Sequence, residues 1–144
     1  MRKILTMAVA LISALTALPS CSKKEQPEKP ASIIGDWNIV SIDVKSAFVG
    51  SREVDVYLSF EDGGAFTVYQ KTGGMRYERF TGTWTLKSDV LSGVYADGSN
   101  LACDYSVSVS DDKLILTSMS EPAEVSVYKR ASIPESVISD AVDD

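Results

Sequence analysis

The chain contains no histidine among its 144 residues and only two cysteines. Histidine is the commonest general base, a member of the usual catalytic triads and a frequent zinc ligand, so these chemistries lack their main side chain. Basic residues are also few, with 14 Lys plus Arg against 20 Asp plus Glu, and the formal net charge is −6. Nucleic-acid-binding proteins show the opposite balance. The composition therefore argues against nucleic-acid binding and against the common zinc-dependent and triad-based enzymes.

The remaining composition is that of an ordinary globular protein, with 44% hydrophobic and 24% charged residues. Such values exclude a mostly disordered or collagen-like chain, and the length corresponds to one domain. Two pairs of adjacent carboxylates, Glu61-Asp62 and Asp111-Asp112, stand in predicted turns, where acidic side chains ordinarily bond the local backbone. Asp97-Gly98-Ser99-Asn100 lacks the length and the terminal glutamate of a calcium loop. We therefore expect no catalytic residues, no metal site and no cofactor.

The N-terminus has the pattern of an export signal. Arg2 and Lys3 precede a run of apolar and small residues from Ile4 to Leu18. This run is shorter than the ~20 apolar residues that a membrane-spanning helix needs, and it is typical of the hydrophobic region of a signal peptide. The sequence therefore predicts a signal peptide over residues 1–20.

Leu18-Pro19-Ser20-Cys21, at the end of this run, resembles a bacterial lipobox, although Pro19 differs from the small residue usual at its position. The resemblance implies cleavage before Cys21 and acyl chains on its sulfur. Two or three chains anchor a protein stably in a membrane, as a single chain does not. The alternative is an ordinary secretory signal followed by an incidental cysteine.

Residues 21–32 are then the lipidated cysteine and a tether, because this segment is polar and contains two prolines. Ser22, rather than an aspartate, follows Cys21. In envelopes with two membranes this resembles the pattern of lipoproteins forwarded to the outer membrane. We therefore expect a lipid-anchored protein of the cell envelope, in the outer membrane, with Cys103 as its one remaining, unpaired cysteine.

From Ile33 onward, hydrophobic residues recur with a period of two, which predicts strands rather than helices. Turn residues such as Asp62-Gly63-Gly64 and Gly73-Gly74 separate the strands. The predicted strands span residues 33–44, 54–60, 66–69, 77–86, 90–95, 101–109, 114–119 and 124–130. Eight successive antiparallel strands with one buried face favour an all-β up-and-down barrel over residues 33–131, with a two-sheet sandwich as the alternative. Residues 132–144 are either a tail or one short amphipathic helix.

Two Gly-x-Trp motifs, Gly35-Asp36-Trp37 and Gly82-Thr83-Trp84, flank a hairpin with the sequence Leu58-Ser59-Phe60-Glu61-Asp62-Gly63-Gly64-Ala65-Phe66. In this order they resemble the lipocalin-like domain of Gram-negative envelope lipoproteins, a calycin-type barrel. The resemblance covers residues 33 to about 130. It implies that Trp37, Trp84 and Arg130 close the barrel, with a basic side chain of the last strand across the first tryptophan. Lys129 is the other basic residue in position for that contact.

The resemblance also implies a small apolar ligand in the barrel, for which Phe66, Phe80 and Tyr105 are the candidate binding residues. A filled core and a small pocket both remain open, with Gly82 and Gly93 as sources of empty volume. We therefore carry two hypotheses. The first is a lipid-anchored, non-enzymatic protein that binds a small hydrophobic molecule.

The second hypothesis is an envelope interaction module that contacts a protein or glycan through its outer face. Several tyrosines lie on the strand face opposite the aliphatic residues and would be exposed there: Tyr57, Tyr69, Tyr77, Tyr95 and Tyr128. Exposed aromatic residues on a sheet often mark a contact surface. Tyrosine is also simply a good strand former, which is the competing explanation.

Overall fold

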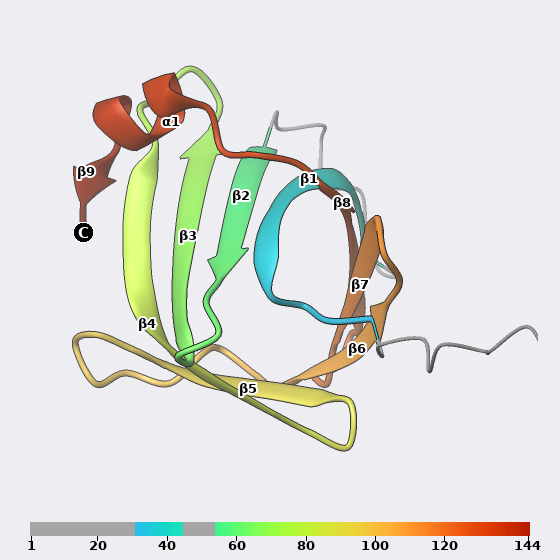
Figure 1. Ribbon diagram of the computed structural model, residues 1–144. Helices are drawn as coiled ribbons and strands as arrows, with labels where there is room; N and C mark the ends of the chain where they lie inside the picture. The colour runs from blue at the N-terminus through green and yellow to red at the C-terminus, as the bar shows by residue number, and fades with distance from the viewer. Residues whose placement is uncertain (1–30, 45–53) are drawn as a thin grey trace, which may run out of the picture.

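The computed structural model describes residues 31–44 and 54–144, which form a closed barrel of eight antiparallel strands with one short C-terminal helix (Figure 1). The barrel strands are β1 (Gly35–Val44), β2 (Val54–Phe60), β3 (Ala65–Thr72), β4 (Glu78–Lys87), β5 (Val90–Tyr95), β6 (Tyr105–Val109), β7 (Lys113–Ser118) and β8 (Glu124–Arg130). The predicted barrel is confirmed, and the two-sheet sandwich is wrong. The predicted signal peptide and most of the tether lie outside the described residues.

Each strand pairs with the next one along the chain, and β1 pairs with β8 to close the barrel. This pairing joins the first and last barrel strands over their whole length, from Trp37 opposite Arg130 to Val44 opposite Glu124. Closure gives β1 and β8 partners on both sides, which removes the exposed edges that an open sheet would carry. The sequential hairpins therefore end in a continuous wall around one interior.

The alternation seen in the sequence is the alternation of inward and outward side chains. In β2, Val56, Leu58 and Phe60 are buried, whereas the residues between them are only half-buried. A strand turns successive side chains to opposite faces, so one parity fills the interior. The buried core cluster takes residues from both ends of the chain, including Trp37 and Tyr128.

A β-bulge in β1 interrupts this alternation. The register between β1 and β8 shifts between Ile39 and Ser41, and the side chain of Val40 is 59% exposed. An extra residue in one strand bends it and increases its twist. β1 accordingly curls around the side of the barrel (Figure 1), and Ile39 and Ile42 both line the interior although they stand three positions apart in the strand.

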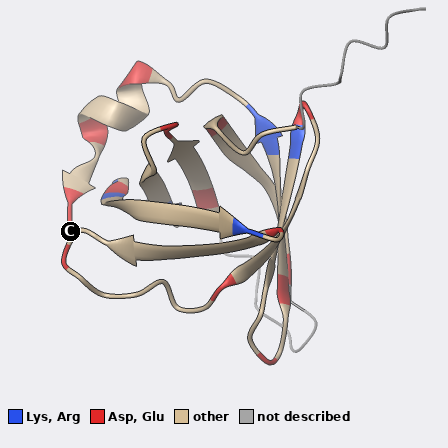
Figure 2. Cartoon of the chain, turned by 60° about the horizontal axis from the view of Figure 1, so that its bottom comes forward, with Lys and Arg blue, Asp and Glu red and all other residues tan. Residues whose placement is uncertain are grey.

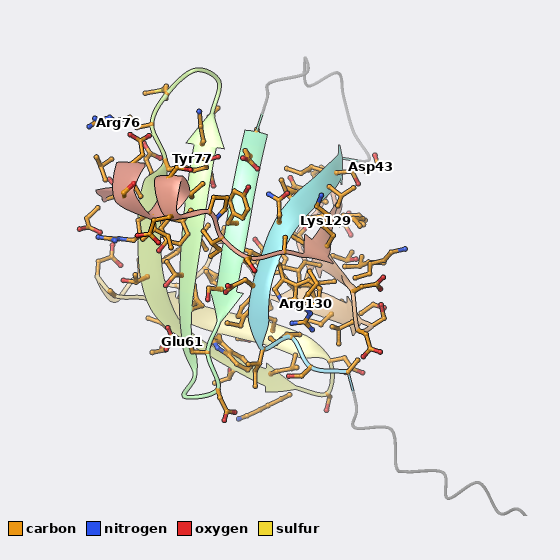
Figure 3. All side chains as sticks on the ribbon, turned by 45° about the horizontal axis from the view of Figure 1, so that its top comes forward. Asp43, Glu61, Arg76, Tyr77, Lys129 and Arg130 are labelled. Carbon is orange, nitrogen blue, oxygen red and sulfur yellow. The ribbon has the colours of Figure 1, made fainter. Side chains whose placement is uncertain are left out.

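Trp37 and Arg130 close one end of the barrel. The Trp37 side chain is fully buried, and its indole N–H donates a hydrogen bond to the Ile33 carbonyl (2.7 Å). The Arg130 guanidinium lies over the indole ring, 3.9 Å from its centroid. It also donates to the backbone carbonyls of Ser32, Ile34 and Asp111 at 2.7–3.0 Å. Figure 3 shows Arg130 near one end of β1 and Asp43 at the other.

Gly35 is required at this closed end for two reasons. Its φ of +121° lies in the region that favours glycine, and a Cβ there would stand 2.5 Å from Arg130 Nη1. The first Gly-x-Trp motif therefore combines a backbone turn, space for the guanidinium and the ring on which it stacks.

One predicted strand is shorter than expected. The prediction placed it over residues 101–109, but β6 begins only at Tyr105. After the turn at Asp97–Asn100 the chain folds back on β5, where the Leu101 N–H donates to the Gly93 carbonyl (3.1 Å). The Leu101 side chain lies against Gly93, and this local contact replaces strand pairing. The alternating hydrophobicity at residues 101–104 therefore reflects side chains that pack on β5, although these residues form no strand.

The C-terminal segment forms a strap on the outside of the barrel. After β8 it crosses to the helix α1 (Glu135–Asp140) and then to β9 (Val142–Asp143), which pairs in parallel with the start of β4 (Figure 1). Val137 is 5% exposed, so the helix buries one apolar residue. The short helix is confirmed. β9 was not predicted, because two residues carry no periodic signal.

The closed end generates a stability prediction. Replacing Arg130 with methionine keeps an unbranched apolar stem but removes the cation–π contact and three hydrogen bonds. We expect the free energy of unfolding in urea to fall by about 2 kcal/mol. Lys129→Met, a change at the exposed neighbouring position, is the matched control and should cost less than about 0.5 kcal/mol. Equal effects of the two changes would contradict this role of Arg130.

Candidate functional site

The barrel encloses a cavity of about 320 Å³. This volume lies at the lower end of the range of small-molecule sites. It extends from Phe60, near the closed end, to Ile42 and Glu124 at the opposite end of the barrel. The lining residues are Ile39, Ile42, Val54, Val56, Leu58, Phe60, Phe66, Val68, Gln70, Trp84, Leu91, Tyr95, Leu101, Tyr105, Leu116, Glu124, Ser126 and Tyr128.

The three candidate ligand-binding residues are placed differently. Phe66 and Tyr105 line the cavity, from β3 and β6. Phe80 is not among the lining residues, and its ring packs against Tyr95, with 6.1 Å between the ring centroids. Tyr95 does line the cavity. Phe80 thus contacts a lining residue but does not itself line the cavity.

Trp84 belongs to the cavity wall as well as to the fold. Its indole N–H donates to the Ala65 carbonyl (2.9 Å), and its ring meets Phe60 edge to face at 5.7 Å. Trp84 also lines the cavity, whereas Trp37 is packed at the closed end. The first Gly-x-Trp motif therefore places its ring at the closed end of the barrel, and the second places its ring in the cavity wall.

The two glycines expected to leave empty volume do not do so. A Cβ on Gly82 would collide with the Phe66 ring at 2.7 Å, and one on Gly93 would meet Leu101 at 2.9 Å. The cavity instead adjoins inward positions with short side chains, among them Val56, Val68 and Ser126.

Besides Trp84, whose indole N–H is bonded to Ala65, six lining residues have polar side-chain atoms: Gln70, Tyr95, Tyr105, Glu124, Ser126 and Tyr128. The sequence analysis identified only some of them. Gln70 shares the inward parity of Phe66 and Val68 in β3. Glu124 and Ser126 share the inward parity of Tyr128 in β8. Extending the alternation to polar positions of these strands would have identified all three.

The lining tyrosines retain their protons well above neutral pH. Burial raises the pKa of Tyr128 to about 12. Burial, together with the neighbouring Cys103 thiol, raises the pKa of Tyr105, and burial raises that of Tyr95. Since a buried phenol loses solvation when it ionises, all three remain neutral hydroxyls that can donate or accept a hydrogen bond.

The expectation of exposed tyrosines is wrong. Tyr95 and Tyr128 line the cavity, Tyr69 is 8% exposed, and Tyr57 and Tyr77 are half-buried. Outward residues of β2 to β4 lie near the C-terminal strap (Figure 3). The strap bonds directly to this region, where the Val142 N–H donates to the Tyr77 carbonyl (2.9 Å).

Tyr77 also takes part in a polar cluster on the outer face. Its hydroxyl donates to Asp55 (2.6 Å), which also accepts a hydrogen bond from the Asn38 side chain (3.0 Å), and Lys71 lies over its ring. These groups satisfy one another and tie β1, β2 and the start of β4 together.

A family model, the Lipocalin-like domain, matches residues 33–116, which is more than half of the chain. The chain belongs to this family. The match begins at the buried Ile33 and ends in β7, so it includes both Gly-x-Trp motifs of the lipocalin-like barrel. No curated protein matches the chain.

Several solved structures are similar to the chain at low sequence identity. An uncharacterized protein from Bacteroides eggerthii has 17% identity and a TM-score of 0.51, covering 68% of this chain and 98% of its own. Human cRBP IV has 16% identity and a TM-score of 0.42, covering 71% and 100%. Fatty-acid-binding protein 1 of Echinococcus granulosus has 14% identity and a TM-score of 0.41, covering 69% and 98%.

Two further observations concern the described residues alone. Nowhere in residues 31–44 and 54–144 do three acidic or cysteine side chains gather in a way that would hold a metal ion. The one helix in these ranges is too short and too polar to span a membrane.

The raised pKa of Tyr128 generates a prediction for alkaline pH. The folded protein holds this proton to about pH 12, whereas the unfolded chain releases it near the ordinary value of 10.0. The corresponding stability is complete below pH 10 and is lost as the pH rises from 10 to 12. Between pH 9 and 11.5, the free energy of unfolding should fall by about 2 kcal/mol more in the unaltered protein than in Tyr128→Phe. Identical losses would contradict the raised pKa.

Proposed function

We propose that this lipocalin-like barrel is a non-enzymatic binding protein for a small hydrophobic molecule, held in the cell envelope by a lipid anchor. The observation that carries the binding function is the interior cavity of about 320 Å³. Its wall is mainly aliphatic and aromatic, with a few polar groups, which is the usual make-up of a small-molecule site. Burial of a ligand's apolar surface against this wall would supply the binding free energy.

Binding rather than catalysis fits the chemistry of the wall. Its tyrosines stay protonated at neutral pH, so they offer hydrogen bonds and apolar surface rather than a base or nucleophile. Glu124 is the one acidic residue among the described residues of the wall. A glycosidase-type pair would need a second carboxyl group across the site.

The proposed anchor rests on the sequence. A signal peptide over residues 1–20, acyl chains on Cys21 and a tether that ends at residue 32 would deliver the barrel to a membrane, and Ser22 favours the outer membrane. Arg130 binds the carbonyls of Ser32 and Ile34, so the chain enters the barrel at its closed end. The opposite end of the cavity would then point away from the anchor.

The alternative, an interaction module with an aromatic outer face, has less support. It rested on exposed tyrosines, and the described tyrosines are buried or half-buried. The binding function is therefore the one that the geometry favours.

Filling the cavity should abolish binding. We expect the neutral apolar dye Nile red to bind to a chain that begins at Ser22, because all the ladders and core residues described above lie within residues 31–144. Val68→Phe places a ring in the cavity and should weaken binding at least tenfold in a fluorescence titration. Val125→Phe, on the outward side of β8, is the matched control and should bind like the unaltered protein. Equal binding by both variants would exclude the cavity as the site.

The anchor is tested separately in bacterial cells supplied with radioactive palmitate. The unaltered full-length protein should be labelled and should sediment with membranes. Cys21→Ala should lose the label completely and leave the membrane fraction. Cys103→Ala removes the other cysteine of the chain and should remain labelled. A Cys21→Ala protein that keeps its label would overturn the lipoprotein assignment.

A further inference from the structure

We propose that the cavity selects apolar molecules whose polar end is an amine or a neutral hydrogen-bond donor, and that it discriminates against carboxylates such as fatty acids. This inference rests on the proposed binding function. It comes from the placement of Glu124 in a wall that, in its described part, contains no basic side chain.

Glu124 is held in place at the end of the cavity opposite Trp37. It is the first residue of β8 and pairs with Val44, and its side chain shares the inward face of the strand with Ser126 and Tyr128. Its backbone N–H donates to the buried Ser118 hydroxyl (2.7 Å). The residue lines the cavity and is half-buried, so it lies at the border between the cavity and the solvent at that end.

The basic side chains whose contacts the structure describes are engaged elsewhere. Arg79 pairs with Asp143, and Arg76 with Asp140, both on the C-terminal strap. Lys71 lies over the Tyr77 ring on the outer face, and Arg130 is bound at the closed end. Figure 2 shows Lys and Arg mainly near strand ends. Neither of the ion pairs found among the described residues includes Glu124.

This arrangement gives the two ends of a ligand different surroundings. A carboxylate head placed at Glu124 would meet a like charge without a described cation to offset it, and like charges at close range repel each other. An ammonium head would instead form a charge-assisted hydrogen bond with the Glu124 carboxylate. The Gln70 amide and the Ser126 hydroxyl, which also line the cavity, can bond a neutral hydroxyl head.

The apolar part of such a ligand fits the rest of the cavity. Between Glu124 and the closed end of the barrel, the wall is formed by side chains such as Leu58, Phe60 and Leu116. A volume of about 320 Å³ corresponds to roughly ten water-sized groups. A straight ten-carbon chain is therefore a suitable probe, with its head group as the only variable.

The experiment compares decylamine, decanol and decanoate as competitors of Nile red at pH 7, each below its micellar concentration, on the chain beginning at Ser22. We expect decylamine to bind at least tenfold more tightly than decanoate, with decanol between them. Glu124→Gln removes the charge at nearly constant size and should reduce the decylamine-to-decanoate ratio to within about twofold. Glu121→Gln removes the same charge from an exposed turn outside the wall and should leave the ratio unchanged. Circular dichroism and the thermal midpoint check that both variants are folded.

The outcomes separate the two proposals. Equal or tighter binding of decanoate, or a ratio that Glu124→Gln does not change, would overturn the head-group inference while the binding function stands. The same holds if Nile red binds and no decyl compound displaces it. If Nile red and all three decyl compounds fail to bind, the proposed binding function fails and the inference fails with it.

Discussion

The stacking of Arg130 on Trp37 is the interaction on which the barrel depends. It joins the last barrel strand to the first, and the two residues stand directly opposite each other in the ladder between β1 and β8. The guanidinium also holds the backbone that enters the barrel, through the carbonyls of Ser32 and Ile34. Closing one end in this way buries Trp37 completely. A cation with several donors in a fixed plane can make all these contacts together, which lysine cannot do.

Once that end is closed, the size of the inward side chains decides how much of the interior remains empty. Large rings such as Phe60, Phe66 and Trp84 fill one part, and Phe66 lies so close to Gly82 that the glycine leaves no space. Where the inward side chains are shorter, the interior stays empty, and this space is the cavity. The polar atoms of the cavity wall come from a few side chains, mainly those of β3, β8 and the tyrosines. In the proposed function, such a wall would bind apolar surface, and its few polar groups would select the head group.

The outer face has a different role from the one that its tyrosines indicated. The strap adds β9 to the edge of β4 and forms ion pairs through Asp140 and Asp143. Tyr77 and Asp55 bond each other beneath the hairpin that joins β3 to β4. Aromatic residues here brace the wall of the barrel instead of presenting a surface to a partner.

The sequence by itself determined the strand order, the turns and the inward parity of strands such as β2, because a period of two and short Gly- and Asp-rich turns are local signals. It assigned Tyr95 and Tyr128 to the outward face, whereas both line the cavity. It also indicated the pairing of a basic residue of β8 with Trp37, through a resemblance of motifs. The cavity, the bulge at Val40, the shortened β6 and the covering of Tyr69 were decided by the tertiary structure alone. Each depends on which side chains from distant strands meet, and on whether Leu101 packs against Gly93 or joins a ladder. Packing is a property of the closed barrel, so no local pattern in the chain contains it.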